Sequence, residues 1–320
     1  MDIKRVTLGI DVGGTNTVFG LVGREGKIYY QEVLPTKNGW NAEELFAAIR
    51  EKVDSFLYDS EYELIGIGVG APNANYYSGK IENPVNLDWG TVDVVSLFDK
   101  HYKGKIKAFI TNDANAAAIG EKEFGVANNM KNFIEITLGT GLGGGIVVNG
   151  ELVYGHDGFA GELGHVKIID DGRLCGCGNR GCLETYASAS GLVRTVHELL
   201  AYYNYDSPIR EINDVDLNSK MVYEFAQEGD KISRIAFELT GYRLGEALAN
   251  FAAALSPEAF ILYGGLANAG ELLIKPVKKS MEKHMMPPFK NKIKILLSGL
   301  PEDKVAIMGT AALAWHELEK

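Results

Sequence analysis

The chain has 320 residues, of which 46% are hydrophobic and 23% charged, and this composition excludes wholesale disorder. Its 32 lysines and arginines against 42 aspartates and glutamates give a net charge of −10, which argues against nucleic acid as the main partner because backbone phosphates are also negative. About two domains of ordinary size are expected.

No apolar run approaches the roughly 18–20 residues that a membrane-spanning helix needs, so no membrane partner is expected. The N-terminus runs into a strand pattern without the apolar core of a secretory signal, and the expected location is the cytoplasm. Glycine is frequent: 38 of the 320 residues, about 12%, are glycine, against a typical share of about 7%. This predicts many tight turns or close backbone approaches.

The first third of the chain alternates between strand and helix patterns. Short apolar runs predict strands at 7–10, 18–22, 28–34, 64–69 and 106–111. Apolar residues at helical spacing predict helices at 41–57 and 94–102. Asn112 is placed to cap a third helix, which ends near Phe124.

The pattern begins again near residue 131. Strands are predicted at 133–138, 146–148 and 151–154, with Asn149–Gly150 as a hairpin turn. A strand, a glycine turn and a second strand thus occur twice, which indicates a repeat at domain scale.

Helices dominate from 185 to 256, and later elements are strands at 259–263 and 292–297 and a last helix from about Asp303. The longest helix is predicted at 231–255, with one apolar stripe buried. That stripe consists of Ile232, Ile235, Leu239, Leu248, Phe251 and Leu255.

The two glycine turns are candidate phosphate sites. Residues 139–144 match the Gly-x-Gly-x-x-Gly fingerprint of dinucleotide-binding proteins, but a strand follows where that fingerprint requires a helix. No Walker loop and no kinase His-Arg-Asp or Asp-Phe-Gly motif occurs. We interpret the turn as a hairpin whose N–H groups face an anion. The first turn, Asp11–Thr15, adds a carboxylate suited to hydrated Mg²⁺. A plain hairpin turn is the alternative for either one alone.

All three cysteines lie between residues 175 and 182, and without an export signal this odd cluster favours a metal over disulfides. Three thiolates and one histidine make a closed structural zinc set. Spacing alone allows either His156 or His165 as the fourth ligand. Three free thiols beside a chance histidine are the alternative, and they would be an oxidation liability.

A carboxylate that accepts the hydroxyl proton is needed for phosphoryl transfer to an alcohol, and Asp113 is the candidate. It follows a predicted strand at the start of a helix, where α/β folds place ligands. Helix capping is the alternative reading, but it accounts for only one of Asn112 and Asp113.

Three segments of the chain resemble the ROK family of repressors and sugar kinases, which is related to actin. NDANAAA (112–118), GELGH (161–165) and CGCGNRGCLE (175–184) carry the resemblance. It implies an α/β, actin-like (ribonuclease H-like) two-domain sugar kinase fold with an interdomain cleft. The smaller domain would comprise residues 1–112, completed by the helix at about 303–320. The larger one would comprise 113–302 and include the zinc-binding segment 165–182.

The resemblance implies ATP-dependent phosphorylation of a hexose, glucose first, at the 6-hydroxyl, with ATP, Mg²⁺ and structural zinc, by a homodimer. Asp113 would be the catalytic base. The implied ATP-binding residues are Asp11, Gly13, Gly14, Thr15, Asn16, Gly139, Thr140, Gly141, Gly264, Gly265 and Leu266. The implied sugar-binding residues are Gly70, Asn86, Asn112, Asp113, Glu162, His165 and Glu184. The implied zinc ligands are His165, Cys175, Cys177 and Cys182.

Several alternatives stay open. Asn73 stands where many relatives have Gly, in a loop that would face the sugar. Kinases of N-acetylglucosamine, N-acetylmannosamine, mannose, fructose or allose stay alternatives to a glucokinase, because the residues near O2 of the sugar decide among them and the sequence does not give their geometry. A sugar-sensing ROK repressor would need about 60–80 residues for DNA binding ahead of the first turn, and a turn that starts at Asp11 leaves no room for them. A noncatalytic sugar-binding protein is disfavoured by candidate groups at every catalytic position.

Overall fold

The structure, a computed structural model, describes residues 3–36, 39–84 and 87–320. The chain divides into two compact units, which we describe separately. Unit 1 comprises Met1–Lys131, Gly145–Ala160 and Gly299–Lys320, and unit 2 comprises Asn132–Gly144 and Gly161–Ser298. This division differs from the predicted boundary after residue 112, although unit 1 does include the C-terminal helix.

Unit 1 is built on a five-stranded sheet with the order β3-β2-β1-β4-β8. β2 is antiparallel to both β1 and β3, whereas β1, β4 and β8 run parallel. The predicted strands in this region are confirmed. Their bounds are β1 (Lys4–Val12), β2 (Asn16–Gly23), β3 (Ile28–Pro35), β4 (Tyr62–Gly70) and β8 (Lys107–Thr111).

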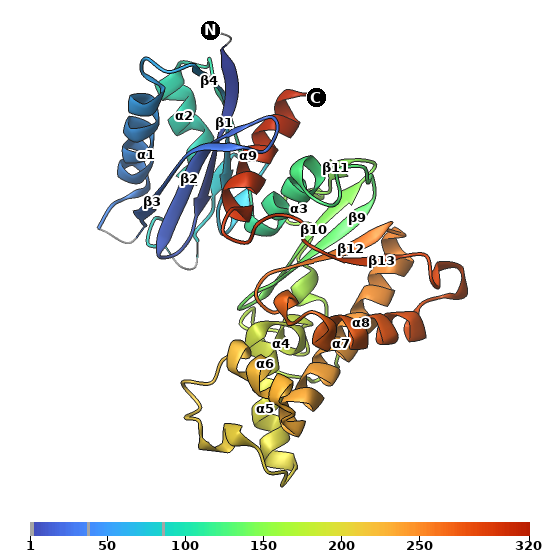
Figure 1. Cartoon of the computed structure of the whole chain (residues 1–320). Helices are drawn as coiled ribbons and strands as arrows, with labels where there is room; N and C mark the ends of the chain where they lie inside the picture. The colour runs from blue at the N-terminus through green and yellow to red at the C-terminus, as the bar shows by residue number, and fades with distance from the viewer. Residues whose placement is uncertain (1–2, 37–38, 85–86) are drawn as a thin grey trace. The chain divides into compact units, whose positions relative to one another are not determined.

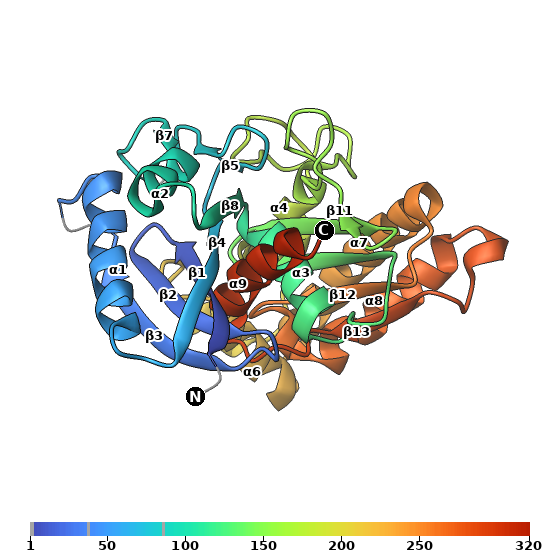
Figure 2. The ribbon, with the colours of Figure 1, turned by 90° about the horizontal axis from the view of Figure 1, so that it is seen from above.

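Helices cover both faces of this sheet (Figures 1 and 2). α1 (Ala42–Leu57) and α2 (Val94–Tyr102) lie on one face and α9 (Val305–Leu318) lies on the other, whereas α3 (Asp113–Phe124) packs against α9. α1 and α2 share one apolar core with the face of β4 that carries Ile67 and Val69. Gly68 points to the other face, because side chains alternate along a strand. There α9 lies so close that a Cβ on Gly68 would be 1.8 Å from the carbonyl oxygen of Thr310.

The contact between α3 and α9 explains why unit 1 continues past residue 112. A Cβ on Gly120 of α3 would lie 2.9 Å from the Cα atom of Gly309 in α9, so the two backbones nearly touch. α3 therefore packs with the C-terminal helix inside unit 1. The sequence offered no sign of this pairing.

A second sheet repeats the strand order of the first, as β11-β10-β9-β12-β13. β10 and β11 are antiparallel, and β9, β12 and β13 run parallel. The predicted repeat is thereby confirmed at the level of the sheets. The bounds are β9 (Phe133–Leu138), β10 (Leu142–Val148), β11 (Glu151–Leu152), β12 (Ala259–Tyr263) and β13 (Lys294–Leu297).

The helices of unit 2 are α4 (Glu184–Ala187), α5 (Ala189–Tyr202), α6 (Ser219–Glu228), α7 (Lys231–Leu255) and α8 (Glu271–His284). The prediction for Leu239 in α7 was wrong, because its side chain is 43% exposed. α8 packs on the face that carries Gly241 and Gly245, where a Cβ on Gly245 would lie 2.3 Å from the carbonyl oxygen of Val277. Small residues, not the large apolar ones, thus mark part of the buried face of α7.

The remaining elements are short. Unit 1 has a three-stranded sheet of β5 (Ala74–Asn75), β6 (Lys80–Ile81) and β7 (Val92–Asp93), which was not predicted because two residues show no alternation. The short 3₁₀ helices are η1 (Leu163–His165), η2 (Pro208–Glu211), η3 (Ala267–Ala269) and η4 (Pro287–Phe289). Across the described residues, no helix combines the length and the hydropathy that crossing a membrane requires.

Candidate functional site

The parallel strands of unit 1 end side by side, and predicted site residues lie at that edge. Asp11 of β1 is in register with Gly70 of β4, which is in register with Thr111 of β8. Asn112 and Asp113 follow Thr111 directly. The sheet thus brings Asp11, Gly70, Asn112 and Asp113 together.

Asn112 and Asp113 have separate roles at the start of α3. The side-chain oxygen of Asn112 accepts a hydrogen bond from the N–H of Asn115 at 2.7 Å, so Asn112 is the helix cap. Asp113 is the first helical residue, and its side chain is exposed. One of its oxygens accepts a hydrogen bond from the N–H of Ala114 at 2.8 Å. Capping therefore accounts for Asn112 and leaves an exposed carboxylate beside it.

The surroundings of Asp11 disfavour the ionised form of its carboxyl group. Burial, and secondarily the negative charge of Asp113, raise the pKa of Asp11 to about 7. A divalent cation at Asp11 would relieve both effects, since it favours the ionised carboxylate and offsets the charge of Asp113. Carboxylate oxygens are the ligands that Mg²⁺ prefers, so this donor set fits the ion.

The first glycine turn, Gly13–Thr15, is tight and is supported by its own sheet. The N–H of Gly13 donates to the carbonyl oxygen of Asn16 at 3.1 Å. The carbonyl oxygen of Thr15 accepts a hydrogen bond from the N–H of Thr36 at 2.8 Å, just after β3. The hydroxyls of Thr17 and Thr36 lie 2.8 Å apart. The turn is thus anchored to the neighbouring strand.

The second glycine turn, Gly139–Gly141, joins β9 to β10, and no helix follows it. The dinucleotide fingerprint is therefore correctly rejected. The N–H of Gly139 donates to the carbonyl oxygen of Gly141 at 3.1 Å. Within the described part of the chain, the N–H groups of Thr140 and Gly141 have no backbone partner. Two adjacent, unpaired N–H groups in an exposed turn can bind an anion.

Three residues that lie outside this turn in the sequence make hydrogen bonds to it or to Leu142 beside it: Glu184, Ala189 and Ser190. We call these three residues the turn clamp. The N–H of Ala189 donates to the carbonyl oxygen of Gly139 at 2.9 Å, and the Ser190 hydroxyl donates to that of Thr140 at 2.7 Å. The N–H of Leu142 donates to Oε2 of Glu184 at 2.9 Å. Ala189 and Ser190 were not predicted from the sequence, because no motif includes them.

The segment Gly264–Leu266 lies against the end of β9. The N–H of Leu266 donates to the carbonyl oxygen of Leu138 at 3.1 Å, and Gly264 has a φ of +102°, which favours glycine. The segment is therefore next to the second turn. A cavity of about 370 Å³ opens beside it, lined by Ser219, Lys220, Tyr223, Glu224, Phe237, Gly265, Leu266, Asn268 and Ala269. The side chains from α6 and α7 were not predicted to line a site, because they belong to ordinary amphipathic helices.

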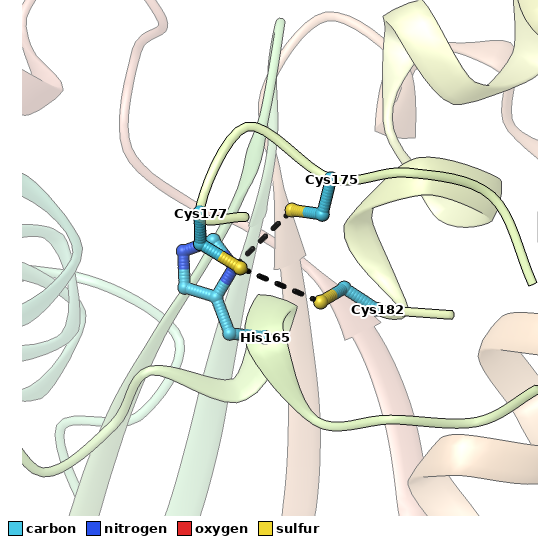
Figure 3. A group of neighbouring side chains, drawn as sticks. All are labelled: His165, Cys175, Cys177 and Cys182. Carbon is cyan, nitrogen blue, oxygen red and sulfur yellow. Dashed lines mark hydrogen bonds between the residues drawn. The ribbon is translucent and has the colours of Figure 1, made fainter. Parts of the chain in front are cut away.

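Four residues of unit 2 form a candidate zinc centre (Figure 3). The ligand atoms of His165, Cys175, Cys177 and Cys182 all lie within 4.8 Å of one another. The sulfur atoms of Cys177 and Cys182 are 3.7 Å apart, and Nδ1 of His165 is 3.6 Å from the sulfur of Cys175. Tetrahedral zinc with Zn–S bonds of about 2.3 Å separates its sulfurs by about 3.8 Å. The residues fit zinc, and among those described it is His165 that joins the cysteines.

Two glutamates flank this centre. Oε2 of Glu162 is 3.8 Å from Nε2 of His165, the nitrogen that does not face the cysteines. Oε1 of Glu184 is 3.7 Å from the sulfur of Cys175. The structure thus brings Glu162, His165 and Glu184 together in unit 2. Asn86 lies outside the described residues.

Arg173 is a further structural residue, and no pattern in the sequence predicted it. Only 8% of its surface is exposed, and its guanidinium makes two hydrogen bonds to Glu198, at 2.8 and 2.6 Å. It also donates to the carbonyl oxygen of Thr185 at 2.6 Å and lies 4.4 Å from the ring centroid of Tyr186. Arg173 therefore ties the cysteine loop, residues 166–183, to α4 and α5 without metal.

Comparisons with known proteins cover nearly the whole chain. The family model described as ROK family matches residues 7–317. A glucokinase of Halalkalibacterium halodurans is 34% identical over 308 residues, 94% of this chain and 93% of that protein. A crystal structure of a ROK family glucokinase from Streptomyces griseus, in complex with glucose and AMPPNP, has a TM-score of 0.78 at 31% identity and covers 97% of this chain and 99% of its own. A xylose repressor of Caldicellulosiruptor bescii is 29% identical over 97% of this chain and 78% of its own length.

Proposed function

The chain belongs to the ROK family and has its actin-like two-domain fold, and on that premise we propose that it phosphorylates a hexose, glucose first, at the 6-hydroxyl with ATP. The observation that carries the proposal is the exposed carboxylate of Asp113 at the start of α3, next to the high-pKa carboxylate of Asp11. The similarity to bacterial glucokinases supports glucose as the acceptor.

In the proposed reaction, Asp113 accepts the proton of the sugar 6-hydroxyl as that oxygen attacks the γ-phosphorus of ATP. The new bond joins O6 to phosphorus. The bond from the γ-phosphorus to the bridging oxygen breaks, and its electron pair leaves with ADP. Asn112, Glu162, His165 and Glu184, with Gly70 and Asn86, would hold the sugar.

The nucleotide would bind at both glycine turns and at Gly264–Leu266. The unpaired N–H groups of Thr140 and Gly141 support a phosphate contact there. Mg²⁺ held at Asp11 would supply positive charge that neutralises the phosphates. Zinc bound by His165 and the three cysteines would fix Glu162 and Glu184 rather than take part in the chemistry.

The test is ADP release from MgATP with a panel of sugars: glucose, mannose, fructose, allose, N-acetylglucosamine and N-acetylmannosamine. We expect one ADP per sugar with glucose, and a phosphorus NMR signal coupled to the protons on carbon 6. Stronger turnover of another member of the panel would reassign the acceptor. Asp113→Asn is the matched control, which should bind glucose without releasing ADP.

A sugar-sensing function is the second candidate, because the repressor similarity covers almost the whole chain. A sensor would bind glucose or xylose in calorimetry but would consume no ATP. Binding without ADP release in the wild-type protein would therefore favour this candidate over the kinase.

A further inference from the structure

The turn clamp places one side chain between two candidate binding regions of unit 2. Glu184 is the first residue of α4 and is half-buried. Its Oε2 accepts the hydrogen bond from the N–H of Leu142, next to the second glycine turn, at 2.9 Å. Its Oε1 faces the zinc centre, 3.7 Å from the sulfur of Cys175. One oxygen of the Glu184 carboxylate therefore contacts the residue next to the second glycine turn, and the other faces the zinc centre.

The contact with the turn is close. A Cβ on Gly141 would lie 2.4 Å from Oε2 of Glu184, so a side chain at this position would displace the carboxylate. Ser190 and Ala189 hold the carbonyl oxygens of the turn at 2.7 and 2.9 Å. α5 thus fixes the carbonyl oxygens of the turn, and the N–H groups of Thr140 and Gly141, which have no backbone partner among the described residues, remain available to a ligand.

Oε1 of Glu184 has a weaker partner than Oε2, since a thiol is a weak hydrogen-bond donor and a zinc-bound thiolate has no proton to donate. A hydroxyl that donates to Oε1 would fix the side chain in the rotamer that also places Oε2 on Leu142. The entropic cost of ordering the Glu184 side chain is then met when the sugar binds. Nucleotide therefore binds more tightly to the protein that already holds sugar.

We propose that the turn clamp couples the two substrates within unit 2: Glu184 positions the second glycine turn as well as holding sugar, and Ser190 is a positioning residue for the same turn. Sugar on Oε1 of Glu184 then raises the affinity of the turn for nucleotide. By thermodynamic linkage, nucleotide raises the affinity for sugar by the same factor. The inference rests on the proposed function, because it requires both ligands.

The first measurement is calorimetry of the full chain with AMPPNP and Mg²⁺, with and without saturating glucose. We expect about a three- to tenfold gain in AMPPNP affinity with glucose, and the same gain in the reverse order. Glu184→Asp keeps the charge but shortens the side chain, and it should bring this gain close to one at saturating glucose. Ser190→Ala should weaken AMPPNP binding about three- to fivefold without changing glucose affinity, and Ser190→Thr should restore it.

Ser280→Ala is the matched control, because the Ser280 hydroxyl donates to the carbonyl oxygen of Tyr242 at 2.7 Å, between α8 and α7. It removes the same kind of bond from unit 2 and should leave AMPPNP affinity and the coupling unchanged. Equal losses in Ser280→Ala and Ser190→Ala would mean general destabilisation and would overturn the role of Ser190.

The second measurement follows the amide of Leu142 by NMR with glucose alone. We expect glucose to shift its resonance and slow its hydrogen exchange in the wild type but not in Glu184→Asp. An unmoved Leu142 at saturating glucose, or an undiminished coupling factor in Glu184→Asp, overturns the proposal and leaves the kinase function intact. If the wild-type protein neither binds nor phosphorylates any hexose, the proposed function fails instead.

Discussion

The two glycine turns occupy equivalent places in sheets of the same strand order, but they differ in charge and in support. Asp11 stands two residues before Gly13, whereas Thr137 stands two residues before Gly139, and the Thr137 hydroxyl accepts a hydrogen bond from the N–H of Gly143 at 3.1 Å. The first turn is anchored to β3, and the second is held by the turn clamp. The repeat thus keeps the backbone turn, while one copy has the carboxylate of Asp11 before it and the other is linked through Glu184 to the cysteine loop.

The largest expected effect tests whether chemistry resides beside the first turn. Asp113→Asn should lower kcat by about 10²–10⁴-fold, because the hydroxyl proton loses its acceptor. Glucose affinity should change little, because the amide is nearly isosteric. Steady-state kinetics and glucose calorimetry measure the two quantities. A near-native kcat would remove Asp113 from the reaction.

Metal removal tests the dependence of the second region on zinc. Purified protein should contain one zinc per chain, and chelation should weaken glucose binding about 10- to 100-fold. AMPPNP binding should suffer less, because Ala189 and Ser190 still hold the turn and Arg173 still ties the cysteine loop to α5. Metal analysis and calorimetry after chelation check this. Unchanged glucose affinity without metal would mean that zinc does not organise the sugar residues.

The high pKa of Asp11 gives the first turn a pH dependence that the second should lack. Protons compete with Mg²⁺ at this carboxylate, so Mg²⁺ affinity should fall nearly tenfold per unit below pH 7. Measured in the presence of AMPPNP, the midpoint should move down in Asp113→Asn, which removes the second cause of the raised pKa. A midpoint that stays near 7 would mean that Asp113 has no influence on Asp11.

The same pKa has a consequence for stability. A carboxyl raised from 3.8 to about 7 on folding binds more protons in the folded state, so its stabilising contribution is lost as pH rises through that window. Asp11→Asn should therefore raise the free energy of unfolding at pH 8 by about 1–3 kcal/mol, and this gain should disappear near pH 4. Urea unfolding at both pH values measures the difference. An equal effect at both would exclude the ionisation of Asp11 as its cause.

The smallest effects separate two glycines of the second turn. No atom lies within 4 Å of a Cβ on Gly139, so Gly139→Ala should fold normally and raise the KM for ATP about tenfold by obstructing the phosphate. Gly141→Ala should raise the KM values for ATP and glucose together, because the new methyl group displaces Glu184. Equal behaviour of the two variants would contradict the different surroundings of these glycines.

Sequence was informative where chemistry and local spacing coincide. Asp11 and Asp113 end or follow strands, and the three cysteines lie within eight residues, so their grouping was predictable. Ser190, Arg173 and the side chains of α6 act through tertiary contacts that leave no spacing pattern. The sequence does not distinguish a buried arginine whose N–H groups are all hydrogen-bonded from an arginine that is exposed to solvent. The double contact of Glu184 was likewise invisible, because it depends on the fold bringing α4 to the turn.

The close seat of α9 on the first sheet bears on how the chain folds during synthesis. The ribosome makes β1, β2, β4 and β8 early, but the helix that covers the Gly68 face comes from residues 305–318. That apolar face stays open until all of unit 2 has been translated. A nascent chain paused inside unit 2 therefore presents a sheet with helices on one face only, and the face that α9 will cover is open to contact with other chains.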